Sequence, residues 1–292
     1  MDIRNITENP LEVSDPKEYL SKMFDLGIEQ LEGYRIIENL PAYPFDINTA
    51  KNQVILKDFI GRIIEELTEG HESLLLLNEI LNPIGYNIYK LNNKEYNQVL
   101  NHIQNANEEQ ADAFGFFFAL LTYSNILPED IFNYADSNGG IDINSTNDLM
   151  SFGIKLQNDC GFDVYDSLLH LSFPLVSSDI FTGKFNKTQN DFDKFKQYAP
   201  GFHSLSPSRI NNGIYLMWQV IYQLNCARNL LKNRPWKQTQ VMSKELDYQE
   251  AVVKAFLLYL GYLGLNGFDQ ESIYVLMFKK QRLNLWRQKT GY

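Results

Sequence analysis

The spacing of apolar residues along the chain predicts a protein built mainly from α-helices. In the first half, apolar side chains recur every three to four positions over residues 15–38 and 48–68, which places them on one helical face. A shorter element is predicted over 72–81, ending before Pro83, and a very apolar helix over 107–124. The alternation typical of strands is weak throughout.

The second half predicts further helices around a less regular stretch. Short helical patches are expected at 146–158 and 164–171, and the many turn formers in 173–207 predict a connector. Long helices are predicted at 208–232, 243–265 and 270–288. We therefore expect one all-α domain over 1–292, a helical bundle formed by 15–135 and 208–292 with an inserted helical and loop region at about 136–207.

Two acidic motifs lie on successive predicted helices. The first comprises Glu65, Glu66 and Glu69, and the second comprises Glu109 and Asp112. Spacings of three and four residues put carboxylates on one face of a helix. Two such faces brought together would offer oxygen ligands to a hard divalent cation such as Mg²⁺.

The commoner explanation of either motif alone is a solvated helix face. Two details favour the cation. Glu66 borders the apolar stripe that includes Ile63 and Leu67 instead of opposing it. Asp112 begins a run that is apolar nearly all round, which implies burial. A buried carboxylate is costly unless it is paired or binds a metal.

Composition narrows the function further. The formal net charge of −10 argues against a general nucleic-acid binder, which would need a basic surface. The four histidines and two cysteines lack the spacing of a zinc site. No apolar run approaches the ~20 residues of a membrane span, and the start does not resemble a signal peptide. We expect a soluble, cytoplasmic protein without a membrane or nucleic-acid partner.

The end of the chain carries a third motif, which fits the two acidic ones. Together they resemble the all-α nucleoside triphosphate pyrophosphatases, a group that includes MazG-like enzymes, dimeric dUTPases and the dCTPases of T-even-type phages. The closing motif is similar to that of the dUTPase and phage dCTPase branch at Lys280, Asn284, Trp286, Arg287, Gln288, Gly291 and Tyr292.

The resemblance implies Mg²⁺-dependent hydrolysis of a deoxypyrimidine nucleoside triphosphate, dUTP or dCTP, to the monophosphate and pyrophosphate. It implies that Glu66, Glu69, Glu109 and Asp112 are the metal ligands. Glu65 would be an additional ligand or a base that positions the water. A homodimer is also implied, in the host cytoplasm if the protein is encoded by a phage.

By the same resemblance, Lys280 and Arg287 would bind phosphate oxygens. Asn284 lies one helical turn from each, so the three share a face. Tyr292 would cap the phosphate or sugar site. The alternative is that a basic C-terminal turn only complements the helix dipole.

Three further residues are candidates for substrate contact. Gln30 would read the base, because relatives use amide side chains of the first helix for this purpose. Trp236 and Lys237 precede a late helix and would touch the substrate. A solvated Gln30 and a loop tryptophan that closes over the core are the alternatives.

A weak internal repeat accompanies these motifs. Segment 118–132 resembles 257–274, since each contains an apolar helix, a turn, acidic residues and a second helix. Where the second copy would carry the acidic motif, a glutamate followed three residues later by an aspartate, the chain has Glu250, Ala251, Val252 and Val253. The first copy would then hold the metal, while the second supplies scaffold and the closing motif. Chance similarity of two amphipathic helix pairs remains the alternative.

Two other functions stay open. One is a MazG-like pyrophosphatase of different specificity, and the other is a catalytically inactive helical interaction protein. All four expected ligand positions are acidic, which favours an active enzyme.

Overall fold

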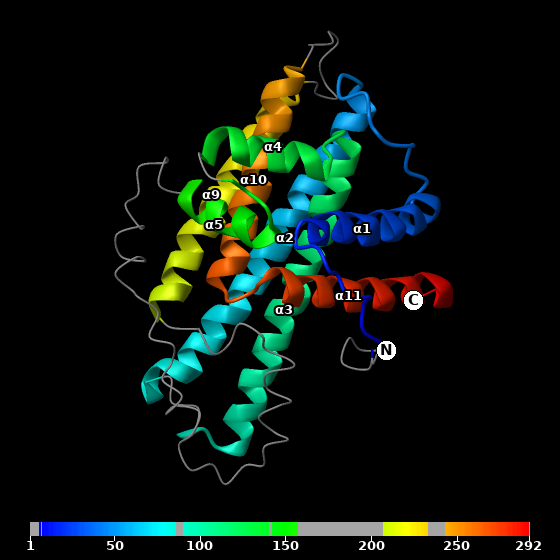
Figure 1. The fold of residues 1–292 in the computed structure, drawn as a ribbon. Helices are drawn as coiled ribbons and strands as arrows, with labels where there is room; N and C mark the ends of the chain where they lie inside the picture. The colour runs from blue at the N-terminus through cyan, green and yellow to red at the C-terminus, as the bar shows by residue number, and fades with distance from the viewer. Residues whose placement is uncertain are drawn as a thin grey trace.

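The computed structural model describes residues 6, 8–85, 90–139, 142–156, 207–232 and 243–291, with the side chains of 207–212 left aside. Within these residues all regular structure is helical, so the predicted all-α class is confirmed (Figure 1). The helices are α1 Glu18–Ile37, α2 Ala50–Leu81, the 3₁₀ turn η2 Asn82–Ile84, α3 Asn93–Tyr123, α4 Pro128–Gly139, α5 Thr146–Leu156, α9 Pro207–Leu230, α10 Glu245–Leu265 and α11 Gln270–Thr290.

Two long helix pairs form the centre of the molecule. Helices α2 and α3 lie side by side and run in opposite directions, and α9 and α10 form a second pair beside them (Figure 1). Helices α1 and α11 pack against each other and cross α3. This arrangement brings the start and the end of the chain to the helices that carry the acidic motifs.

Helix α2 is longer than the sequence pattern predicts. We expected separate elements over 48–68 and 72–81, but a single 32-residue helix runs through both. Gly70, which lies between the two predicted elements, is buried in the helix against α3. Close packing at this position keeps the glycine helical despite its low intrinsic propensity.

Helix α3 also begins earlier than predicted, at Asn93 and not at 107. Asn92 caps it, because its side chain accepts hydrogen bonds from the backbone N–H groups of Lys94 and Glu95. Glu95 in turn accepts from the N–H of Asn92, which completes a capping box. This extension packs a small separate apolar cluster that includes Val99 and Ile103 against the end of α2.

The main core is rich in aromatic side chains. Phe114, Phe117 and Phe118 of α3 meet Phe256 and Tyr259 of α10, with ring centroids between 4.8 and 6.2 Å apart for the contacting pairs. All five side chains are essentially inaccessible to solvent. This cluster ties the acidic half of the bundle to the second helix pair.

Helix α5 lies within the stretch expected to be an insertion, yet it belongs to the core. Gly153 of α5 and Gly261 of α10 approach so closely that a Cβ on Gly261 would lie 2.8 Å from the backbone of Gly153. Leu149 and Phe152 are buried against the same region. The packed bundle therefore extends past residue 136, where we expected the insertion to begin. The helix predicted over 164–171 lies outside the described residues.

The turns after α3 and α10 support the internal repeat. The N–H groups of Ser124, Asn125 and Ile126 bond to the carbonyls of Leu120, Thr122 and Leu121. The N–H groups of Asn266, Gly267 and Phe268 bond in the same pattern to Tyr262, Gly264 and Leu263. Asn125 and Gly267 both have positive φ, 56° and 87°. The same backbone motif thus ends both helices.

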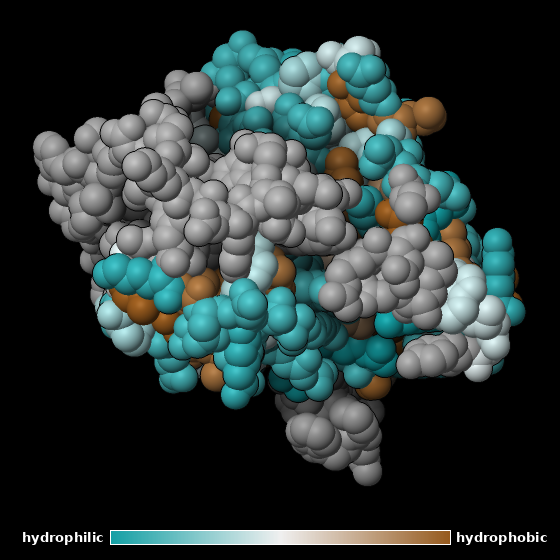
Figure 2. Space-filling model, turned by 90° about the horizontal axis from the view of Figure 1, so that it is seen from below, coloured by the Kyte–Doolittle hydropathy of each residue, from teal (hydrophilic) through white to brown (hydrophobic). Residues whose placement is uncertain are grey.

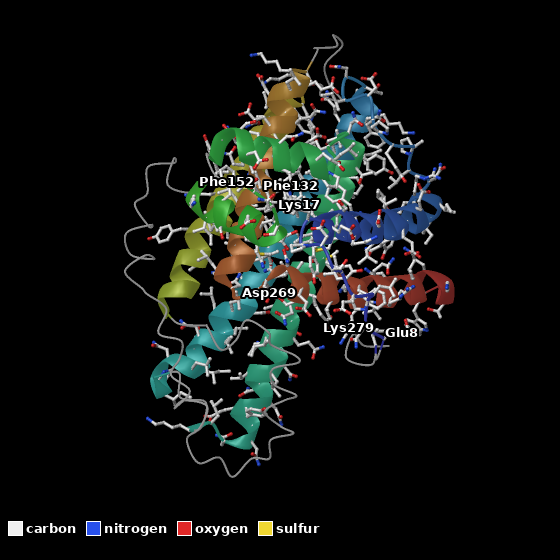
Figure 3. The ribbon with its side chains drawn as sticks, in the orientation of Figure 1. Glu8, Lys17, Phe132, Phe152, Asp269 and Lys279 are labelled. Carbon is white, nitrogen blue, oxygen red and sulfur yellow. The ribbon has the colours of Figure 1, made fainter. Side chains whose placement is uncertain are left out.

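This alignment of the two turns pairs Asp112 with Lys254 and Glu109 with Ala251. The ammonium of Lys254 forms an ion pair with Glu250 of its own helix, 2.9 Å apart. Helix α10 therefore lacks the acidic positions of α3, as the sequence predicts, although the turns place the alignment one residue later than the sequence comparison did. Asp269 caps the start of α11 at the bend (Figure 3), because its carboxylate accepts from the N–H of Ser272.

The underside of the molecule, at the free end of the α2–α3 pair, is mostly hydrophilic where it is described, with small scattered hydrophobic patches (Figure 2). Among the described helices, none has by itself the length and hydropathy needed to cross a membrane. Among these helices, only α10 and α11 taken together have that length and hydropathy, and their axes are bent by 104° relative to each other.

Candidate metal and nucleotide site

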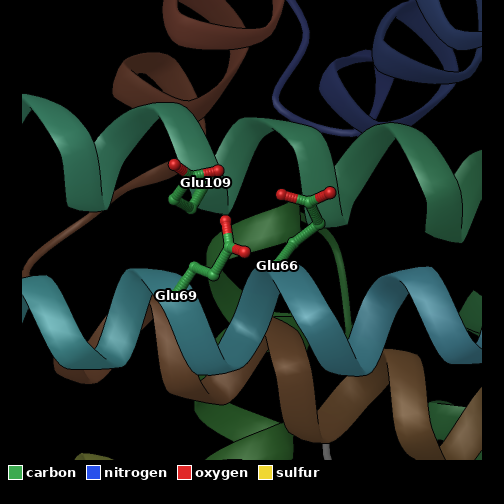
Figure 4. A group of neighbouring side chains, drawn as sticks. All are labelled: Glu66, Glu69 and Glu109. Carbon is green, nitrogen blue, oxygen red and sulfur yellow. The ribbon is translucent and has the colours of Figure 1, made fainter.

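The two acidic motifs meet where α2 faces α3. The carboxylates of Glu66 and Glu69 project from α2 toward Glu109 of α3 (Figure 4). One oxygen from each lies within 4.8 Å of the others. Glu66 and Glu109 are half-buried, while Glu69 is exposed at the edge. We call Glu66, Glu69 and Glu109 the carboxylate cluster.

The electrostatics of the carboxylate cluster are unfavourable without a cation. Burial, the hydrogen bond with Glu109 and repulsion from Asp112 raise the pKa of Glu66 to about 8. Burial also raises the pKa of Glu109, against the effect of its hydrogen bond with Glu66. The two carboxyl groups thus share a proton near neutral pH. A divalent cation would replace that proton and cancel the repulsion, so these oxygen donors fit Mg²⁺.

Asp112, the fourth expected ligand, has a different neighbour. Its Oδ2 lies 2.7 Å from Nζ of Lys280, whose side chain is 5% exposed, against 27% for Asp112. Burial raises the pKa of Asp112, and Lys280 opposes that shift. Asp112 therefore stands beside the carboxylate cluster but balances a buried ammonium. This placement favours a role for Lys280 in holding Asp112 over direct contact with phosphate.

A cavity of about 240 Å³ adjoins the carboxylate cluster between α1, α2, α3 and α11. Glu66 belongs to both the cluster and the cavity wall, and Asp112 lies on the same wall. The other polar and aromatic residues that line the cavity include Gln30, Tyr34, Phe59, Arg62, Phe116, Asn284 and Arg287. The structure thus brings Gln30, Asn284 and Arg287, predicted from separate parts of the chain, to one cavity.

The closing motif is held against α1 and α3. Asn284 is buried, and its Oδ1 lies 3.5 Å from Nη1 of Arg287, at the limit of a hydrogen bond. Gln288 packs on Gly33 of α1, and a Cβ at Gly33 would collide with the side-chain amide of Gln288. The Nε2 of Gln288 lies 3.4 Å from the backbone carbonyl of Gln30. Packing of Gln288 therefore fixes α11 so that Arg287 faces the cavity.

Arg62 and the aromatic residues that line the cavity, Tyr34, Phe59 and Phe116, were not among the site residues predicted from the sequence. The Arg62 guanidinium pairs with Asp58 at 3.0 Å and lies over the ring of Phe116, 5.4 Å from its centroid. Arg62 precedes Glu66 by four residues, so it shares the helical face of a candidate ligand. That spacing was the available signal. Phe59 and Tyr34 carried none, because core aromatics have the same periodicity.

Glu65 is exposed on α2, outside the carboxylate cluster. Trp236, Lys237 and Tyr292 lie outside the described residues, so their predicted substrate contacts stay predictions.

The raised pKa of Glu66 predicts how stability depends on pH without metal. A carboxyl whose pKa is higher folded than unfolded stabilises the fold at low pH and loses that contribution as pH rises. The metal-free protein should therefore lose stability up to about pH 8. Burial lowers the pKa of His71, so the contribution of His71 to stability increases with pH, but only below about pH 6.5. Between pH 6.5 and 8, the change in folding stability should therefore come from the carboxylates and not from His71.

Thermal melts across that window would test this expectation. The melting temperature should fall as pH rises in EDTA, and millimolar Mg²⁺ should remove the fall. A melting temperature in EDTA that is flat or rises from pH 6.5 to 8 would contradict the proton shared by Glu66 and Glu109.

No protein-family profile, curated protein or solved structure was found to match the chain significantly.

Proposed function

We propose that this protein is a Mg²⁺-dependent pyrophosphohydrolase of deoxypyrimidine nucleoside triphosphates, dUTP or dCTP. One observation carries the proposal: Glu66 belongs both to the carboxylate cluster and to the wall of a cavity that Arg62 and Arg287 also line. A cation site that opens onto a cavity with two guanidinium groups suits a substrate that carries both phosphates and a ring.

The residues divide into two groups by chemistry. Glu66, Glu69 and Glu109 would hold Mg²⁺, with Asp112 beside them. When bound, the ion would neutralise phosphate charge and lower the pKa of a coordinated water. Arg287 offers a planar fork to phosphate oxygens, a geometry that lysine cannot reproduce. Phe59 and Phe116 give the cavity an apolar surface for a base, and the amide of Gln30 offers both a donor and an acceptor to a base edge.

Pyrophosphate release from a panel of dUTP, dCTP, dTTP, dATP and dGTP, with Mg²⁺ and with EDTA, tests the proposal. We expect turnover of dUTP and dCTP that requires the metal, and almost none of the purines. Weak turnover of dTTP is expected, because rejection of a single methyl group amounts to only about 1–3 kcal/mol. Purine turnover equal to that of dUTP and dCTP would favour the MazG-like alternative, and no turnover at all would favour an inactive interaction protein.

Arg287 provides a second test. Arg287→Ala should lower kcat/KM by an amount that corresponds to about 2–4 kcal/mol of lost transition-state stabilisation, the range for truncating one partner of a desolvated charge pair. Arg287→Lys should recover only part of the loss. Arg282→Ala is the matched control, because Arg282 lies on the same helix but is exposed and 3.7 Å from Glu8. Equal activity of the Arg287→Ala and Arg282→Ala variants would remove Arg287 from the site.

A further inference from the structure

We infer that Gly70 and a buried clamp, formed by Gln110, Tyr259 and Tyr262, set the separation of α2 and α3 at the carboxylate cluster. This separation makes the site prefer Mg²⁺ to the larger Ca²⁺. The inference rests on the proposed function. These four residues are positioning residues. None of them carries a carboxylate, so each acts through the helices that bear Glu69 and Glu109.

Gly70 is a point of close approach between the two helices. A Cβ at Gly70 would lie 2.7 Å from Nε2 of Gln110, 3.3 Å from Cβ of Glu109 and 3.6 Å from the carbonyl of Ala106. Gly70 directly follows Glu69, so both sides of this contact adjoin residues of the carboxylate cluster. The absence of a side chain at 70 therefore determines how near the oxygens of α2 come to Glu109.

Gln110, whose side chain faces Gly70, is held in place by burial and by helix α10. Its side chain is only 3% exposed, and its Nε2 donates to the hydroxyl of Tyr262 at 3.3 Å. Its backbone carbonyl accepts from the hydroxyl of Tyr259 at 2.6 Å. Both tyrosines are completely buried on α10, and Tyr259 stacks on Phe117 at 4.8 Å. Helix α10 thus holds the segment of α3 that carries Glu109.

Cation size makes this spacing matter. Mg²⁺ requires oxygens at about 2.0–2.1 Å in a nearly ideal octahedron, whereas Ca²⁺ accepts about 2.3–2.6 Å in flexible geometry. A slight separation of α2 from α3 should therefore weaken Mg²⁺ binding more than Ca²⁺ binding. Outer partners of metal ligands commonly affect affinity by about 10–100-fold, so the effect should be measurable.

Calorimetric titration of the full chain with MgCl₂ and with CaCl₂ tests the inference without any substrate. Gly70→Ala should raise the Kd for Mg²⁺ by about tenfold and the Kd for Ca²⁺ by less. Tyr259→Phe, which keeps the ring but removes the bond to Gln110, should shift the ratio of the two Kd values in the same direction. If Gly70→Ala does not fold by circular dichroism, Tyr259→Phe decides the question.

Matched controls separate positioning from general stability. Gly61 also lies on α2, but a Cβ added there would meet nothing within 4 Å, so Gly61→Ala should leave both affinities unchanged. Tyr248 is also fully buried on α10, and its hydroxyl lies 2.9 Å from Oγ of Ser124. Tyr248→Phe should lower the melting temperature and leave the Mg²⁺ to Ca²⁺ ratio as it is.

The outcomes distinguish this inference from the proposed function. If the wild type binds Mg²⁺ and the Gly70 and Tyr259 variants keep its selectivity, the positioning role is refuted while the proposed function stands. If the wild type binds neither cation, both are refuted. A selectivity shift in these variants, absent from both controls, supports the inference.

Discussion

The Glu66→Gln variant should lose nearly all Mg²⁺-dependent hydrolysis and yet melt at a higher temperature than the wild type in EDTA. Glu66 belongs to both the proposed cation site and the cavity wall. Loss of this ligand should lower kcat/KM by about 100-fold or more, since even outer partners of metal ligands affect binding by about 10–100-fold. The stability gain follows from the raised pKa of Glu66, because a neutral amide removes the cost of ionising the carboxyl at pH 8.

Glu72→Gln is the matched control for this variant. Glu72 lies on the same helix and is exposed, outside the carboxylate cluster. It should keep both activity and melting temperature. Wild-type hydrolysis by Glu66→Gln would refute the assignment of Glu66 as a ligand, and a lower melting temperature in EDTA would refute the electrostatic strain assigned to the carboxylate cluster.

The Asp112→Asn variant should behave in the opposite way and lose stability in EDTA. Burial raises the pKa of Asp112, so a neutral side chain at 112 would by itself stabilise the fold, but Lys280 is the more deeply buried partner, 5% exposed against 27%, and would be left without its counter-charge. We expect the second effect to dominate. Removal of one partner of a buried ion pair leaves an uncompensated charge and costs about 3 kcal/mol. Chemical denaturation at pH 7 would measure the loss. Activity should fall as well, because Asp112 lines the cavity.

Two further variants test the origin of that loss. Asp112→Asn combined with Lys280→Met should recover part of the stability, since no unpaired buried charge remains. Glu250→Gln breaks the pair with Lys254, the counterpart of Asp112 in the second helix pair, and should cost less than about 1 kcal/mol because that pair is largely exposed. Equal losses for Asp112→Asn and Glu250→Gln would show that Lys280 is not held by Asp112 alone.

Local pattern was enough to predict most helices and their faces. The period of apolar residues predicted α10 and α11 to within two residues at each end. It failed where burial and long-range packing overrode local propensity. Two separate helices were predicted on either side of Gly70, but the contact of Gly70 with α3 keeps α2 continuous. The start of α3 was missed although the sequence shows it: Asn92 and Glu95 have the spacing of a capping box, and Tyr96, Val99, Leu100 and Ile103 follow at helical spacing.

For the site, the sequence by itself determined that acidic residues share helical faces and that Asn284 and Arg287 face the same way, since both follow from the helical repeat. Only the tertiary structure decided which groups meet. In the folded protein Glu66, Glu69 and Glu109 lie close together, and Asp112 forms an ion pair with Lys280. Arg62 and Phe116 line the cavity. The physical reason is that periodicity fixes direction around one helix axis, whereas the register between helices depends on packing contacts such as Gly70 against Gln110.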